Sequence, residues 1–247
     1  MGKGRIIGKP NDPTPTVASG VWSLTEQLLA KKGNTWIPII PISIIYNEIS
    51  SATTATHTFT GVNFGPSRGD RIIGVISHYR SGGSITHSSA SIGGISATIA
   101  TSRPATTVGS AIFYANVPSG DSGSVSITMS STVTQRSITI FSFYPSTSNI
   151  SVSGNNNGLT GTPASITTTV TTGVGGCIAA GVRRGGGTPT LSTSSGYNLV
   201  DEERFSMSTE QYHNAVFDPT TSSGTETITG SGPATGTMTL VAAAFYW

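Results

Sequence analysis

The fold of this chain is decided by one stretch near its end, Met238-Thr239-Leu240-Val241-Ala242-Ala243-Ala244-Phe245-Tyr246-Trp247. The stretch is apolar and ends in aromatic residues, and the turn residues Gly232, Pro233 and Gly236 precede it, which is the pattern of a β-strand. Since the last residues of a chain fray unless they pack against something, we expect a central or closing strand of a β domain.

An earlier stretch, Ser137-Ile138-Thr139-Ile140-Phe141-Ser142-Phe143-Tyr144, resembles the first one. Each stretch lies at a similar distance after a proline: 26 residues separate Pro118 from Tyr144, and 27 separate Pro219 from Tyr246. Apolar strands, glycine turns and alternating segments also follow one another in the same order before each stretch. The sequence therefore predicts two copies of one unit.

We expect an all-β fold with two related β-sandwich units in tandem, Ig-like or jelly-roll-like, at residues 57–146 and 160–247. Each unit has turns at intervals that suit six or seven strands, and an Asn-rich linker, Gly154 to Gly158, separates the units. Two arrangements are open. Each copy forms its own sandwich, which we favour, or the two copies pair into one larger sandwich.

Composition supports a packed β protein and excludes several classes. The chain has 247 residues, of which 31 are Gly and only 10% are charged, and its net charge is +2. That charge is too small to indicate a nucleic-acid partner. The single cysteine, Cys177, excludes a disulfide framework and is expected to be a buried strand residue. The most apolar run, 36–46, is too short to span a membrane, so no membrane insertion is expected.

Residues 1–50 are expected to form an anchor arm that precedes the β units. Residues 1–20 are rich in Pro, Gly and Thr and are read as extended. Ser23 and Glu26 have the spacing of a capping box, which predicts one short helix over residues 24–32. The Ile- and Pro-rich segment 36–46 is extended, and it either covers the β units or adds a strand to another protein. The residues predicted to bind a partner are Trp22, Leu24, Leu28, Trp36, Ile37, Ile39, Ile40, Ile42, Ile44 and Ile45.

Two serine motifs were considered as nucleophile sites. Gly65-Pro66-Ser67-Arg68-Gly69 fits G-x-S-x-G, but an apolar strand follows it and the motif requires a helix there. Gly120-Asp121-Ser122-Gly123 fits the GDSG of chymotrypsin-like proteases, but it occupies a turn whose counterpart in the second copy lacks the motif. We expect both segments to be turns and predict no catalytic residue.

Other polar groups are also expected to be structural. The histidines, at positions 57, 78, 87 and 213, lack metal-ligand spacing, so no metal and no cofactor is predicted. The carboxylates of Asp201, Glu202, Glu203 and Glu210 are expected in a solvated loop, and Arg183-Arg184 at an exposed hairpin tip. If the chain binds carbohydrate, the expected residues are Tyr197, Tyr212, Trp247 and the segment 201–203.

The arm carries a resemblance to a known class of proteins. Its residues 6–27, from Ile6-Ile7-Gly8 through Ala18-Ser19-Gly20-Val21-Trp22-Ser23-Leu24 to Glu26-Gln27, resemble the opening I-I-G-x-x-N-x-P-T-x-x-x-A-S-G-V-W-S-L-x-E-Q of structural proteins of tailed bacteriophages, often tail fibre or minor tail proteins. The Trp-Pro that usually follows the helix is Trp36-Ile37-Pro38 here, which departs by one residue.

The resemblance implies a non-enzymatic component of a bacteriophage virion, tail-associated and fibre-like or adaptor-like. Its N-terminal arm would dock on the particle, and its β units would be exposed. The implied partners are other virion proteins and further copies of the chain. A capsid decoration or head-fibre protein is the alternative within this class. From another class, a carbohydrate-binding or depolymerase domain is the further alternative, with a host-surface glycan as partner.

Overall fold

The computed structural model describes residues 42–145, 149–161, 163–173, 176–218, 223–233 and 236–247. These residues form seventeen strands and no helix. The strands of the first half are β1 (Ser43–Ser50), β2 (Thr54–Asn63), β3 (Ile72–Arg80), β4 (His87–Ile92), β5 (Ile95–Ser96), β6 (Thr98–Pro104), β7 (Val108–Asn116), β8 (Ser122–Val133) and β9 (Gln135–Phe143). Those of the second half are β10 (Ser151–Leu159), β11 (Ser165–Thr172), β12 (Cys177–Gly185), β13 (Thr190–Thr193), β14 (Asn198–Met207), β15 (Glu210–Asp218), β16 (Gly224–Ser231) and β17 (Met238–Tyr246).

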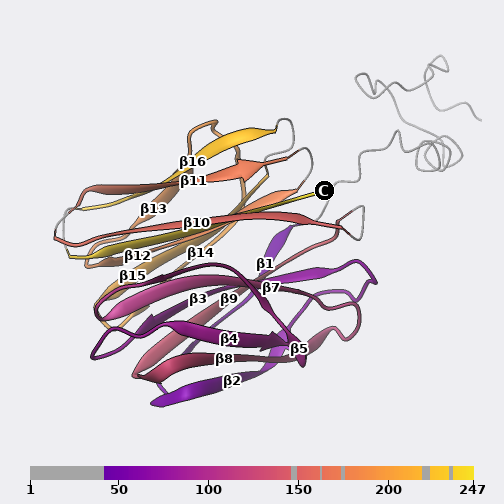
Figure 1. Cartoon of the computed structure of the whole chain (residues 1–247), viewed down its shortest axis with the longest axis horizontal. Coiled ribbons are helices and arrows are strands. Elements are labelled where there is room, and N and C mark those ends of the chain that lie inside the picture. Colours follow the sequence, from indigo (N-terminus) through magenta and orange to yellow (C-terminus); the bar gives the residue numbers. More distant parts are fainter. Residues whose placement is uncertain (1–41, 146–148, 162, 174–175, 219–222, 234–235) are drawn as a thin grey trace, which may run out of the picture. The chain divides into compact units, whose positions relative to one another are not determined.

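The strands pair in four antiparallel sheets that stack in layers (Figure 1). The inner sheets of the two halves have equivalent strand orders. The first inner sheet has the order β1-β9-β3-β7-β6, and the second inner sheet has the order β10-β17-β12-β15-β14. The outer sheets are β2-β8-β4-β5 and β11-β16-β13. Strand β17 therefore lies inside its sheet between β10 and β12, in the position that β9 occupies between β1 and β3.

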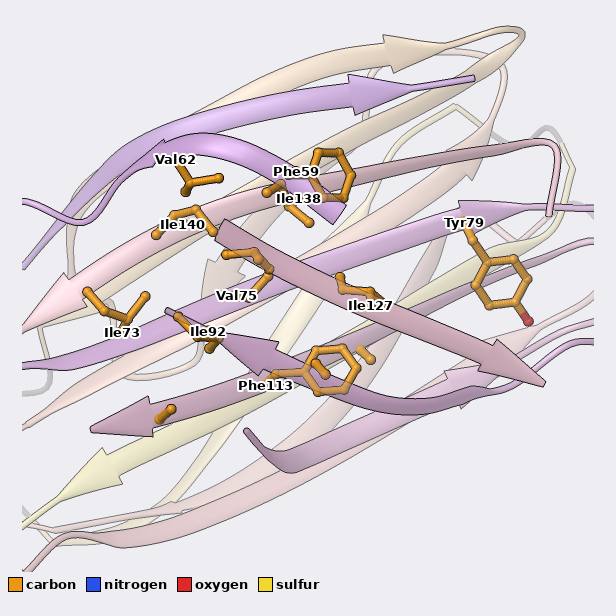
Figure 2. Packing of buried hydrophobic residues seen from close by; sticks show 14 of the residues in the cluster. Phe59, Val62, Ile73, Val75, Tyr79, Ile92, Phe113, Ile127, Ile138 and Ile140 are labelled. Atoms are coloured by element: carbon orange, nitrogen blue, oxygen red, sulfur yellow. The ribbon is translucent and has the colours of Figure 1, made fainter. Parts of the chain in front are cut away.

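Each half buries an apolar core between its inner and outer sheets. In the first half, Phe59 and Ile127 of the outer sheet pack against Ile73, Val75 and Ile140 of the inner sheet (Figure 2). Alternation along β8 places Val125, Ile127 and Met129 in this core. Strand β2 contributes Phe59 and Val62, which lie on either side of a register shift. In the second half, residues of β11 and β16 pack in the same way against β12, β15 and β17.

A third core, the middle core, lies between the two inner sheets. Ile72, Ile76 and Phe141 of the first half contact Ala179 and Phe245 of the second half in it. Strands β3 and β12 are consequently buried on both faces, which explains why they read as continuous apolar runs and not as alternating ones. Each half thus buries one core of its own, and the two halves bury the middle core together.

The inner sheets approach each other closely at one of their edges. Gly154 of β10 lies against the backbone of Ala100 in β6, so that a Cβ at position 154 would overlap with the carbonyl oxygen of Ala100. Strand β10 belongs to the second half and β6 to the first. Glycine at position 154 is therefore required for the contact between the halves.

Several sequence expectations need correction here. Residues 43–50, assigned to the arm, form β1 and pair with β9. The Asn-rich linker forms part of β10 and pairs with β17, because Asn side chains at this sheet edge bond to neighbouring strands and not to solvent alone. The expected carboxylate loop, 201–203, lies within β14 and pairs with β15. The predicted helix 24–32 and the arm before residue 42 lie outside the described residues.

We predict that Gly154→Ala lowers the free energy of unfolding by about 1–3 kcal/mol, since overpacking between two backbones cannot be relieved by a rotamer change. Gly224→Ala is the matched control, because Gly224 also lies in a strand and has nothing within 4 Å of an added Cβ. Urea denaturation of both variants measures the effect. Equal stability of the two variants would contradict the close approach of β10 to β6.

Candidate functional site

The loop between β2 and β3 is held in place by one buried guanidinium. Arg71 is completely buried, and it donates hydrogen bonds to the carbonyl oxygens of Gly65 (2.7 Å), Val117 (2.9 Å), Ser119 (3.2 Å) and Gly120 (2.6 Å). Arginine suits this position because its planar fork presents several donors in fixed directions. The β2–β3 loop and the β7–β8 turn are thereby fixed to each other.

The same contact brings the two serine motifs together. Ser67 of the first motif donates to Asp121 of the second through its hydroxyl, at 2.6 Å, and through its backbone N–H, at 2.9 Å. These hydrogen bonds lower the pKa of Asp121, because they favour the ionised carboxylate. In these bonds the hydroxyl of Ser67 donates to a carboxylate, whereas a nucleophilic serine would donate to an imidazole. The motifs therefore form a junction between the β2–β3 loop and the β7–β8 turn. The first motif is a turn as expected, whereas Ser122 and Gly123 of the second motif already belong to β8.

A pocket opens beside this junction. It has a volume of about 330 Å³ and is lined by Ser43, Ile45, Pro66, Ser67, Arg68, Ser142 and Tyr144. Tyr144 donates its hydroxyl proton to the carbonyl oxygen of Pro66 at 2.8 Å, which fixes the ring. The guanidinium of Arg68 lies 5.3 Å from the centre of that ring. The pocket thus combines an apolar wall with hydroxyl groups and one cation.

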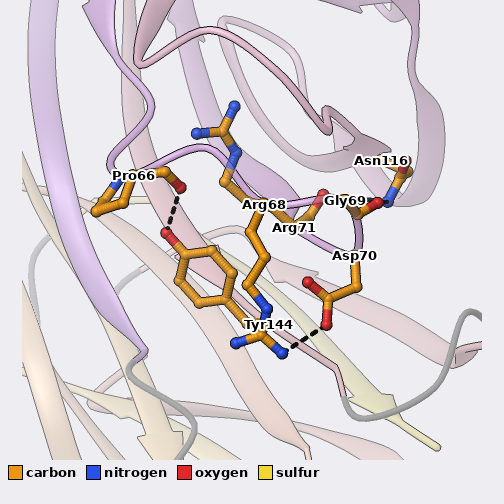
Figure 3. A network of polar contacts seen from close by, with 7 residues as sticks. All are labelled: Pro66, Arg68, Gly69, Asp70, Arg71, Asn116 and Tyr144. Carbon is orange, nitrogen blue, oxygen red and sulfur yellow. Dashed lines mark hydrogen bonds and ion pairs between the residues drawn. The ribbon is translucent and has the colours of Figure 1, made fainter.

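The cation in the pocket is only partly engaged. One terminal nitrogen of Arg68 lies 2.6 Å from a carboxylate oxygen of Asp70, and the other points away from it (Figure 3). The Arg68 side chain is 55% exposed. It can therefore offer further N–H groups to a ligand without leaving its place over Tyr144.

A second group of polar residues lies in the middle core. The ring of His78 contacts the hydroxyl of Ser110 through Nδ1, at 2.7 Å, and the side-chain oxygen of Asn214 through Nε2, at 2.7 Å. Because the Asn214 oxygen can only accept, Nε2 carries the proton and Nδ1 accepts from Ser110. Ser110 in turn contacts Thr239 at 3.0 Å. Serine, histidine and asparagine thus stand in the order of a nucleophile, a base and an orienting group.

This arrangement is closed to substrate. His78, Ser110 and Asn214 are each at most 1% exposed, and burial lowers the pKa of His78 from 6.5 to about 4. The three residues come from both halves of the chain, with Asn214 on β15 and the other two on β3 and β7. The group therefore joins the inner sheets, and sequence reasoning missed it because its members are 32 and 136 residues apart.

The remaining sequence candidates lie elsewhere. Arg183 and Arg184, expected at an exposed tip, are buried on β12, where Arg183 forms an ion pair with Glu210. They are inside because β12 is covered on both faces. Tyr212, considered for carbohydrate, is also buried. Within the described parts of the chain, no group of three or more His, Cys, Asp or Glu side chains is placed to hold a metal ion, and no helix could span a membrane.

The segment 201–203 also has a structural partner. Asp201 accepts a hydrogen bond from the backbone N–H of Ile44 at 2.9 Å, and Glu203 accepts one from Asn47 at 3.4 Å. Both contacts join β14 to β1. Trp247 is half-buried and stacks on Phe143, with ring centres 6.0 Å apart.

Three of the predicted anchor residues belong to the β fold. Ile42 is buried in the middle core, Ile44 packs against that core, and Ile45 packs against the core of the first half. The other predicted anchor residues lie outside the described residues: Trp22, Leu24, Leu28, Trp36, Ile37, Ile39 and Ile40. A partner-binding role for these seven stays a prediction.

No protein-family model matches this sequence, and no curated protein matches it. Among solved structures, BuGH86 in complex with neoagarooctaose is 14% identical over 82% of this chain and 34% of that chain, with a TM-score of 0.30. The PBSX exported protein XepA is 9% identical over 83% and 86% of the two chains (TM-score 0.23), and a chain of Sulfolobus turreted icosahedral virus is 13% identical over 84% and 60% (TM-score 0.24). This chain spans about a third of the length of the first of these. Similarities with such low TM-scores carry no argument about function.

We predict that Arg71→Ala lowers the free energy of unfolding by roughly 3 kcal/mol, because four carbonyl oxygens lose their donor. The stability of Arg71→Lys should lie between that of Arg71→Ala and that of the unchanged chain, since an ammonium cannot reach all four carbonyl oxygens. Arg68→Ala is the control and should change stability by less than about 0.5 kcal/mol, because its ion pair is exposed. Chemical denaturation that ranks Arg68→Ala with Arg71→Ala would refute the role of Arg71.

The buried histidine predicts a pH dependence of stability. The unfolded chain binds a proton at His78 with a pKa near 6.5, whereas the folded chain does so only near pH 4. The stabilising contribution is therefore complete above pH 6.5 and is lost as the pH falls towards 4, by on the order of 3 kcal/mol. Burial lowers the pKa of His87 to about 3, so His87 adds a loss of the same sign.

Urea denaturation between pH 7.5 and pH 4.5 measures this dependence. His78→Gln should be less stable at neutral pH and should lose less stability on acidification than the unchanged chain. His57→Gln is the comparison variant. Burial also lowers the pKa of His57, but this ring is on an outer strand and only half-buried, so its replacement should change the pH slope less than that of His78. An unchanged pH slope in His78→Gln would show that His78 does not titrate as described.

Proposed function

We propose that this chain is a non-enzymatic structural component of a bacteriophage virion, tail-associated and fibre-like or adaptor-like. In this proposal, residues 1–41 dock on the particle and the β part is exposed. The observation that carries it is the resemblance of residues 6–27 to the opening of tailed-phage structural proteins. That segment directly precedes a β part that begins at Ser43 and buries three apolar cores.

The proposal divides the chain at a different residue from the one the sequence indicated. Strand β1 pairs with β9 from Ser43 onwards, and Ile42 packs in the middle core. The docking segment therefore ends at about residue 41, and residues 43–50 are part of the exposed body. We also propose that the body is a duplicated sandwich, because both halves have the same strand order and each buries its own core.

The body suits a part that bears mechanical load. Its cores are formed by long strands with many hydrogen bonds between distant parts of the chain. The sheet edges of the halves are joined by side chains, such as Asp201 to β1 and Asn156 to Thr101 of β6. A fibre exposed to shear and an adaptor between particle parts both need a body that keeps its shape, which these bonds between distant strands favour.

The alternative within the same class is a capsid decoration or head-fibre protein. The number of copies per particle separates the two, because tails carry a handful to a few dozen copies of a component and heads carry hundreds. A carbohydrate-binding or depolymerase domain is the alternative from another class. Release of soluble sugars from host polysaccharides by the purified chain would favour a depolymerase over the non-enzymatic role.

We predict that deletion of residues 1–41 yields a folded β protein that no longer joins particles. The full-length chain and the truncated chain, each tagged at the C-terminus, are produced during infection by the phage that carries this gene, and purified particles are probed for the tag. Deletion of residues 1–5, which leaves the segment 6–27 intact, is the control and should still assemble. Incorporation of the chain that lacks residues 1–41 would refute the docking role.

A further inference from the structure

We propose that the pocket beside Tyr144 binds a neutral sugar residue of a glycan. This inference concerns a site in the described part of the chain and does not depend on the virion role. The site is formed by the start of β1, the β2–β3 loop and the segment at the end of β9; Figure 3 shows Pro66, Arg68 and Tyr144 of it. None of the residues considered for carbohydrate from the sequence takes part in it.

The size of the pocket suits one small ring. Its volume of about 330 Å³ lies at the lower end of the range for small-molecule pockets, which is roughly 300–1,000 Å³. Gly65 adjoins two of the lining residues: a Cβ there would lie 3.6 Å from the Ser142 hydroxyl and 3.6 Å from the Tyr144 hydroxyl.

The polar groups of the pocket match those of a sugar. Ser43, Ser67 and Ser142 contribute hydroxyl groups, each of which can both donate and accept. Ser142 is 3% exposed and lines the pocket. Its hydroxyl can donate to or accept from a ligand hydroxyl there.

The apolar groups complete the match. Ile45 and Pro66 present a hydrocarbon wall to the pocket, which suits the C–H face of a sugar ring. Arg68 is held over Tyr144 and has N–H groups that Asp70 does not use, so it can donate to ring or hydroxyl oxygens. Binding would thus use one apolar face and several hydrogen bonds around the rim of the ring.

The charges near the pocket favour a neutral ligand over an acidic one. The β2–β3 loop and the β7–β8 turn carry two arginines, Arg68 and Arg71, and two aspartates, Asp70 and Asp121. Arg68 is paired with Asp70, and Arg71 donates to four carbonyl oxygens. Because the charges of these two arginines and two aspartates balance, an added carboxylate or sulfate would meet no excess positive charge, and an acidic sugar would gain little.

The test is a binding assay of the full-length chain against two panels of oligosaccharides. The neutral panel contains glucose, galactose, mannose and N-acetylhexosamine oligomers, and the acidic panel contains uronic-acid and sialic-acid oligomers. We expect binding to at least one neutral oligosaccharide and none to the acidic panel. Absence of binding to every neutral oligosaccharide, or a preference for the acidic panel, would overturn the proposal.

Matched variants locate the site. Arg68→Ala and Ser142→Ala should each weaken binding of that oligosaccharide by about tenfold, the effect of one lost hydrogen bond. Arg204→Ala is the control, because Arg204 also forms an exposed ion pair with a carboxylate two residues away, Glu202, but lies on β14 and does not line the pocket. It should bind like the unchanged chain. Full affinity in both Arg68→Ala and Ser142→Ala, with unchanged melting temperatures, would place the binding elsewhere and refute the proposal.

Discussion

The structure depends on a chain of hydrogen bonds that crosses the middle core. Each group donates to the next: Thr239 to Ser110, Ser110 to His78, His78 to Asn214, Asn214 to Thr139, Thr139 to Asn47, and Asn47 to Glu203. Successive members lie on different halves at four of these steps. Apolar packing alone would allow two flat inner sheets to slide over each other, whereas these bonds are satisfied in one register only. The network therefore fixes how the two halves fit together.

The two halves cover each other's inner sheets in equivalent ways. Strand β1 of the first half contacts β14 of the second, and β10 of the second half contacts β6 of the first. Since β1 and β10 have equivalent places in their sheets, and so do β6 and β14, each half presents the same surface to the other. This is the arrangement of a two-fold dimer, here formed within one chain. Because both halves belong to one chain, their contact carries no entropy cost of association, and polar residues such as His78 can be tolerated in it.

Sequence reasoning succeeded for strands that are buried on both faces and failed for β10 and β14, which lie at the edges of the inner sheets. The runs 72–79, 177–182 and 238–246 are apolar because both of their faces are covered, and their β-branched and aromatic residues indicate strands directly. Strands β10 and β14 have few apolar residues, because their side chains bond to other strands across the contact between the halves. Those partners are far away in sequence, so Asn156 and Asp201 looked like linker and loop. The pocket beside Tyr144 could not be predicted either, since Ser43, Arg68 and Ser142 are far apart in the sequence and meet only in the folded chain.

The position of β1 links the pocket to the proposed docking segment. Ser43 and Ile45 line the pocket, while Ile42 and Ile44 pack in or against the middle core. Alternate side chains of the same few residues thus serve the two sites, as the two-residue period of a strand requires. A force applied to residues 1–41 would reach β1 first, where seven registered pairs with β9 resist it. Because Ser142 of the pocket is itself the β9 partner of Ser43, the geometry of the pocket depends on that pairing. A ligand that bridges β1, the β2–β3 loop and β9 would in turn stabilise the pairing of β1 with β9.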